Sequence, residues 1–111
     1  MTAEDKTVFV YATFPSAAVA EDIGGALVDA RLAACVNILP QMTSIYIWEG
    51  KRQRDAEAAM IVKTRASLGD SVVSAIVARH PYETPAVAVL PVAGGSAAFL
   101  AWIGAQTGEG S

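Results

Sequence analysis

Two kinds of hydrophobic repeat alternate along the chain and predict its secondary structure. Short stretches rich in β-branched and aromatic residues predict four strands. Apolar residues at three- and four-residue spacing predict two helices of ordinary length and a short third one. The strands are expected over residues 7–13, 34–48, 52–64 and 87–90, and the helices after Ser16, after Ser67 and around Phe99. The resulting order is β-α-β-β-α-β-α.

Several residues mark where these elements begin, bend and end. Ser16 is placed to cap the first helix, and Ser67 with Asp70 three residues later resembles a capping box for the second. Proline interrupts the second strand, which predicts a bulge at residues 40–42. Glu49-Gly50-Lys51 supplies a turn, so the second and third strands form one long hairpin.

This order predicts the α+β class and a ferredoxin-like split β-α-β sandwich, with helices on one face of an antiparallel sheet. A hairpin arm of about 12 residues spans roughly 40 Å, whereas a domain of this size has a radius of gyration near 13 Å. The hairpin must therefore overhang its own domain. Tyr46 and Trp48 lie near its tip, where their large side chains are exposed unless another subunit buries them. The sequence therefore predicts an oligomer with both residues in the interface.

Length and charge narrow the class of protein. The 111 residues fit a single domain, with loose tails expected over 1–6 and 108–111. Only 17% of residues are charged and 53% are hydrophobic, which excludes a disordered chain. The net charge is -3 and the basic residues are scattered, so we expect no nucleic-acid partner. The polar start and the lack of a long apolar run predict a cytoplasmic protein without a membrane partner.

Cys35, His80 and Glu83 are residue types that a thiol enzyme uses, but no catalytic or phosphate-binding motif accompanies them. We therefore expect no enzymatic activity. Cys35 begins an apolar strand and fits either a small core residue or a soft metal ligand. His80 precedes Pro81 and fits either a helix cap or a ligand. A thiolate with an imidazole favours copper, and further ligands must come from carboxylates, water or a second subunit.

Polar residues elsewhere suggest a binding cleft or an ordinary solvated surface. Glu57 and Lys63 are an even number of residues apart in one strand and are expected on the same face. Two prolines stiffen the loop that carries Tyr82 and Glu83. The basic run at residues 51–54 is interpreted as a solvated hairpin tip.

Four motifs follow one another along nearly the whole chain. They are Ala33-Ala34-Cys35-Val36-Asn37-Ile38, Ser44-Ile45-Tyr46-Ile47-Trp48-Glu49-Gly50, Glu57 with Lys63-Thr64, and His80-Pro81-Tyr82-Glu83. Together they resemble the CutA family of divalent-cation tolerance proteins. The resemblance implies a ferredoxin-like homotrimer whose hairpins wrap neighbouring subunits, and a role in tolerance of copper and other divalent metals. It also implies Cys35 and His80 as metal ligands and an inter-subunit cleft lined by Glu57, Lys63, Tyr82 and Glu83.

Two positions depart from the pattern of that family. Phe14 stands where many members have a cysteine, and Ala86 stands where many have a glutamate, so one thiolate and one carboxylate candidate are missing. Two other functions stay open. One is a small-molecule sensor trimer similar to the PII signalling proteins, with an anionic or zwitterionic metabolite in the cleft. The other is a structural or partner-anchoring module.

Overall fold

The computed structural model describes residues 5–108 and contains four strands and three α-helices in the order that the sequence predicts. The mixed α+β class is therefore confirmed. A single 3-10 turn, η1 (Ala66–Leu68), precedes the second helix. The elements are β1 (Thr7–Phe14), α1 (Ala17–Asp29), β2 (Cys35–Trp48), β3 (Lys51–Arg65), α2 (Gly69–Arg79), β4 (Val87–Pro91) and α3 (Ala97–Gln106).

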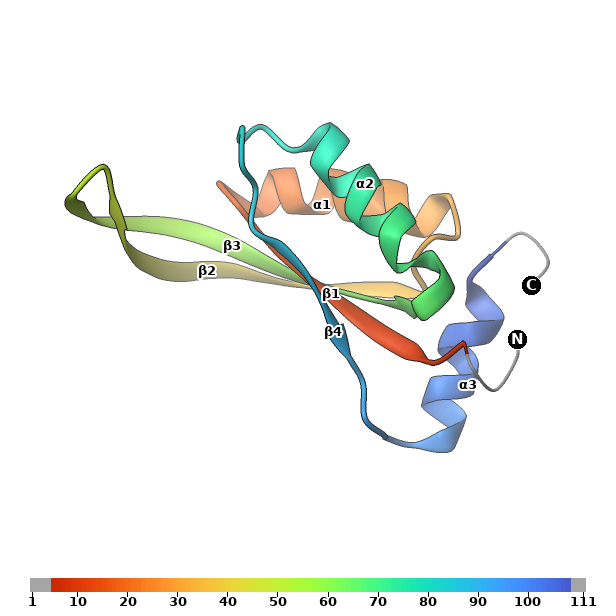
Figure 1. Cartoon of the computed structure of the whole chain (residues 1–111). Helices are drawn as coiled ribbons and strands as arrows, with labels where there is room; N and C mark the ends of the chain where they lie inside the picture. Colours follow the sequence, from red (N-terminus) through yellow and green to blue (C-terminus); the bar gives the residue numbers. More distant parts are fainter. Residues whose placement is uncertain (1–4, 109–111) are drawn as a thin grey trace.

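The strands form one sheet in the order β2-β3-β1-β4, and every neighbouring pair is antiparallel. The two β-α-β units are β1-α1-β2 and β3-α2-β4. Their strands interleave in the sheet: β3 lies between β1 and β2, and β1 lies between β3 and β4. Both α1 and α2 cover the same face of the sheet, while α3 lies at the end away from the hairpin tip (Figure 1).

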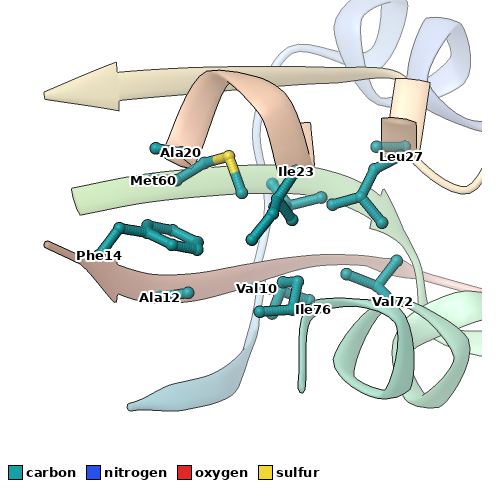
Figure 2. Close-up of a cluster of buried hydrophobic side chains, with 11 residues drawn as sticks. Val10, Ala12, Phe14, Ala20, Ile23, Leu27, Met60, Val72 and Ile76 are labelled. Carbon is teal, nitrogen blue, oxygen red and sulfur yellow. The ribbon is translucent and has the colours of Figure 1, made fainter. Parts of the chain in front are cut away.

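Strict alternation in β1 decides which side chains form the core. Val8, Val10, Ala12 and Phe14 are buried beneath the two helices, whereas the residues between them stay partly exposed. Figure 2 shows Phe14, Val10 and Met60 meeting side chains from α1 and α2. The first helix begins at the predicted cap, where the Ser16 Oγ accepts a hydrogen bond from the Val19 amide. The core thus lies between the sheet and one helical layer.

The β2–β3 hairpin extends well beyond the helices (Figure 1). The chain measures 47 × 26 × 21 Å, and its radius of gyration of 14.8 Å exceeds the roughly 13 Å of a compact domain of this length. Glu49 and Gly50 form the two-residue turn, both with positive φ (50° and 80°), which matches the twist of the two strands. The register shifts between Leu39 and Met42, confirming the predicted bulge.

The capping box predicted for α2 is wrong. Leu68 occupies the N-cap position without a side-chain hydrogen bond, and α2 begins at Gly69. Ser67 instead contacts Asp5: its amide donates to Asp5 Oδ1 at 2.9 Å and its hydroxyl donates to Oδ2 at 2.7 Å. Asp5 also pairs with Arg65. The strand-to-helix connection is therefore fixed by a residue from before β1.

The expectation of loose tails over residues 1–6 and 108–111 does not hold at Asp5 or Gly108. Asp5 is held by Ser67 and Arg65, and the Gly108 amide donates to the Arg31 carbonyl at 2.9 Å. Arg31 Nε in turn donates to the Gly108 carbonyl. The rest of those predicted tails, residues 1–4 and 109–111, lies outside the described residues.

The third helix is apolar on more than one side. Ile103 is buried as expected, but Phe99 and Trp102 retain 37% and 43% of their surface exposed. Their rings stack on each other with centroids 6.3 Å apart. Within residues 5–108, every helix is too short or too polar to cross a membrane.

The close approach of α1 to the sheet generates a stability prediction. A Cβ at Gly24 would lie 2.8 Å from Met60 Sδ and 3.0 Å from Val36 Cγ2, whereas one at Gly25 would meet nothing within 4 Å. We expect Gly24→Ala to lower the free energy of unfolding by about 1–3 kcal/mol through overpacking. Gly25→Ala is the matched control and should raise it by up to about 1 kcal/mol. Urea denaturation of both variants measures the difference, and equal effects would contradict the packing argument.

Candidate functional site

One face of the sheet, which we call the open face, carries most of the candidate residues. It is the face turned away from α1 and α2. Residues paired directly across antiparallel strands project to the same face, so Cys35, Lys63 and Phe9 share it with Leu90. Among the helices within residues 5–108, α1 and α2 cover the other face, and α3 packs against this one near Lys63 (Figure 1). Most of the open face is therefore accessible to a ligand or another chain.

His80 lies on the other side of the sheet and forms part of the packing. It ends α2, and its ring stacks on Phe14 with centroids 4.9 Å apart. The ring Nε2 lies 2.7 Å from the Thr13 carbonyl oxygen, and the Tyr82 amide donates to Nδ1 at 3.1 Å. Because a carbonyl only accepts and an amide N–H donates, we assign the donor role to Nε2 and the acceptor role to Nδ1. Both ring nitrogens are therefore already used to hold the loop after α2 against β1.

Two tyrosines donate hydrogen bonds to two carboxylates of the hairpin strand β3. The Tyr82 hydroxyl donates to Glu57 Oε2 at 2.9 Å, and the Tyr46 hydroxyl donates to Asp55. Burial and the hydrogen bond to Glu57 raise the pKa of Tyr82 to about 12. The Asp55 hydrogen bond likewise raises the pKa of Tyr46. Both phenols are therefore held neutral as donors at physiological pH.

Lys63 occupies a separate part of the open face. Its ammonium donates to the Asn37 side-chain oxygen and lies 5.8 Å and 5.6 Å from the ring centroids of Phe9 and Phe99. Cation–π attraction and the hydrogen bond together hold this amine between β2 and α3. Lys63 and Glu57 do share a face, but they are six residue positions apart, which corresponds to roughly 20 Å of strand.

The residues predicted for the ligand cleft therefore divide into two groups within one chain. Glu57 and Tyr82 are in contact, whereas Lys63 lies apart from them with Asn37. Glu83 is exposed and forms no hydrogen bond or ion pair with another residue of the described part of the chain. A single chain thus offers no site in which one small metabolite contacts both Glu57 and Lys63.

The two predicted metal ligands are also separated. Cys35 pairs with Lys63 on the open face, while His80 bonds to Thr13, whose partner in β3 is Ala59. The offset along β3 is roughly 13 Å, and the two side chains lie on opposite faces. Among residues 5–108, no three His, Cys, Asp or Glu side chains lie close enough together to hold a metal ion. A complete metal site within one chain is absent from this region.

Sequence reasoning missed three polar partners. Asn37 binds Lys63, Asp55 binds Tyr46, and the Thr13 carbonyl binds His80. The spacing gave a signal for two of them, because Asn37 is two residues from Cys35 and Asp55 is two residues from Glu57. Alternation in a strand places such residues on one face. The carbonyl of Thr13 has no side-chain signal in the sequence.

Comparison with known proteins shows close similarity to one family. Residues 8–106 match the family model described as CutA1 divalent ion tolerance protein. The chain is 39% identical over 99 residues to the divalent-cation tolerance protein CutA of Pectobacterium atrosepticum, covering 89% of this chain and 90% of that protein. It is 42% identical over 103 residues to a chloroplastic CutA 1 of Oryza sativa, covering 93% of this chain.

Solved structures agree with the sequence matches. The structure of the divalent ion tolerance protein CutA1 from Ehrlichia chaffeensis superposes with a TM-score of 0.91 at 31% identity, covering 96% of this chain and all of that one. The chain spans between 53% and 62% of the length of several plant and animal relatives that it matches.

The contact between Tyr82 and Glu57 generates a prediction about pH. A pKa of about 12 lies above the ordinary value of 10.0, so the folded protein holds this proton more tightly than the unfolded chain. The resulting stability is fully present below about pH 10 and is lost as the pH rises through about 12. A pH titration followed by tyrosinate absorbance should show one tyrosine that ionises near pH 12, and this step should be absent in Tyr82→Phe.

Glu57→Gln should lower the pKa of Tyr82, because it removes the carboxylate that favours the neutral phenol. Glu83→Gln, which changes a neighbouring carboxylate without such a contact, serves as the control. Equal titration curves for Glu57→Gln and Glu83→Gln would contradict the assignment.

Proposed function

The chain belongs to the CutA1 divalent ion tolerance family, and we propose that it acts in divalent-cation tolerance by binding copper or another divalent metal as a homotrimer. The match to the family model over residues 8–106 is the observation that carries this proposal. It spans the whole sheet and all three helices. The proposed role is non-catalytic, and the strand order β2-β3-β1-β4 supports classing the fold as ferredoxin-like.

Exposed apolar surface supports assembly of several copies. Ile45, Ile47 and Trp48 near the hairpin tip expose 55%, 66% and 62% of their surface. Strands that project this much apolar surface are prone to aggregation unless another chain covers them. Leu39 and Leu90 extend the apolar surface onto the sheet itself. A trimer that covers the hairpin and the open face accounts for these exposures.

We propose that the metal lies at a subunit boundary, with Cys35 as a thiolate ligand. Cys35 is a free cysteine, only partly buried, on the face that such a trimer would cover. A soft thiolate favours Cu(I) or Zn²⁺ over Mg²⁺ or Ca²⁺. Since one chain offers no complete ligand set, the remaining ligands come from a neighbouring subunit or from water.

His80 is the second proposed ligand, and the structure sets a condition on it. Metal binding at Nδ1 would displace the Tyr82 amide, and binding at Nε2 would displace the Thr13 carbonyl. Ligation by His80 therefore requires the loop after α2 to rearrange. Cellular location stays a prediction as well: the sequence suggests the cytoplasm, whereas two plant relatives are named chloroplastic.

Native mass spectrometry of metal-stripped protein, titrated with Cu(I) and Zn²⁺ under reducing conditions, tests the metal proposal. We expect a trimer that takes up one ion per subunit and a Cys35→Ser variant that loses at least roughly tenfold in affinity. Cys35→Ser should still assemble, because it changes one atom. Unchanged affinity in that variant would remove Cys35 from the site.

His80→Ala separates a ligand from a packing residue. Loss of two hydrogen bonds and of the Phe14 stack should lower stability by about 2–4 kcal/mol, measured by urea denaturation. If the folded variant also binds metal more weakly, His80 serves as a ligand. If its affinity equals that of the wild type, the role of His80 is structural.

Trp48→Ala tests the assembly proposal. We expect it to cost about 2–4 kcal/mol of association free energy, since a covered tryptophan is a common centre of interface energy. Sedimentation over a dilution series measures this loss. Val77→Ala, which changes an exposed apolar residue on α2, is the control and should assemble normally. Wild-type association in Trp48→Ala would exclude the hairpin tip from the interface.

A further inference from the structure

One ammonium group on the open face has no anionic partner. Within residues 5–108 the only ion pair joins Arg65 to Asp5, so no carboxylate of that region lies within ion-pair distance of Lys63. Glu57, which shares its strand and its face, is roughly 20 Å away along β3. The ammonium has three N–H donors, and Asn37 accepts from one of them. Two donors of a partly buried cation are therefore left for another acceptor.

The surroundings of Lys63 add positive rather than negative potential. Its ammonium lies 5.6 Å from the ring centroid of Phe99, the third residue of α3. The first turn of a helix carries the positive end of the helix dipole, and acidic side chains are its usual complement. The first turn of α3 contains no acidic residue. A lysine beside such a turn makes this place favourable for an anion.

Apolar side chains border the ammonium and continue outward from it. Phe9 lies directly opposite Lys63 in the sheet, and Leu90 lies directly opposite Phe9, so all three project from the open face. Leu90 exposes 48% of its surface and Phe99 exposes 37%. We call Phe9, Asn37, Lys63 and Phe99 the lysine niche. Leu90 and the ring of Phe99 form its exposed apolar border.

We propose that the lysine niche binds the carboxylate of a small molecule whose apolar part lies over Phe99 and Leu90. The carboxylate accepts the two remaining N–H groups of the ammonium, and hydrogen bonds between ionised partners are stronger than neutral ones. A single lysine among apolar side chains suits one negative charge, because a dianionic phosphate costs more to desolvate and needs more donors.

The site needs one chain and no metal, so the proposal goes beyond the role in divalent-cation tolerance. Its position also separates it from the hairpin tip. The lysine niche lies beside α3, at the end of the sheet away from that tip (Figure 1).

Isothermal titration calorimetry of metal-stripped protein with hexanoate tests the site. Hexanamide has the same chain without the charge, and inorganic phosphate has charge without the chain, so both serve as ligand controls. We expect hexanoate to bind at least roughly tenfold more tightly than either control. Because the protein holds no metal in this experiment, the result does not depend on whether the proposed metal site is correct.

Variants of Lys63 identify the group that binds the carboxylate. Lys63→Met should weaken hexanoate binding at least roughly tenfold, whereas Lys63→Arg keeps the charge and should stay within about threefold of the wild type. The matched control, Lys6→Met, removes an exposed lysine outside the niche and should bind as the wild type. Circular dichroism verifies that each variant is folded.

Three results would overturn the proposal. Equal binding of hexanoate and of either control compound would show that the niche does not select a carboxylate with an apolar chain. Equal hexanoate binding by the wild type and folded Lys63→Met would exclude the ammonium. If the wild type binds no hexanoate and Lys63→Met weakens association of the copies in sedimentation, the carboxylate that pairs with Lys63 belongs to a neighbouring chain.

Discussion

The sheet buries only one of its two faces under α1 and α2, and the position of every candidate residue depends on that asymmetry. Alternation in β1 sends Phe14 into the core and Phe9 to the open face. The same alternation in β3 separates buried Val62 and Thr64 from Lys63 between them. The second face exposes apolar residues such as Leu90, and such exposed apolar surface is suited to binding a ligand or another chain.

His80 illustrates how packing changes the meaning of a residue type. A histidine between a helix end and a proline fits a metal ligand as well as a structural tie. Here its ring makes three contacts: it stacks on Phe14, donates to the Thr13 carbonyl in the same strand, and accepts from the Tyr82 amide. Tyr82 then extends the contact to Glu57 at the base of the hairpin. The loop after α2 is therefore held to β1 through the imidazole of His80 and to the hairpin through the hydroxyl of Tyr82.

The proposed metal site and the proposed trimer both require several copies of the chain to associate. A bound metal ion needs several ligands, whereas residues 5–108 place one thiol on the open face and bring no three His, Cys, Asp or Glu side chains together. The projecting hairpin leaves apolar residues near its tip exposed, and the part of the chain that the structure describes does not cover them. The proposed association of several copies would bring side chains from different subunits to one boundary. It would thereby supply further metal ligands and bury the exposed apolar residues of the hairpin. Function in this family is therefore proposed to depend on assembly.

Local patterns determined much of this protein by themselves. The element order, the Ser16 cap, the bulge after Leu39 and the long hairpin all follow from short-range periodicity and turn chemistry, and the structure confirms them. The motifs likewise identified the family that the comparisons show. The capping box at Ser67 failed because Asp5, distant in sequence, binds that serine instead.

Only the tertiary structure decided which candidate residues meet. Cys35 and His80 are separated, Lys63 turns to Asn37 rather than Glu57, and Tyr82 reaches Glu57 across the end of β1. The physical reason is that these contacts depend on strand register and on which sheet face a helix covers. Such properties arise from pairing between segments far apart in the chain, whereas the sequence pattern reports only on neighbours within a few residues.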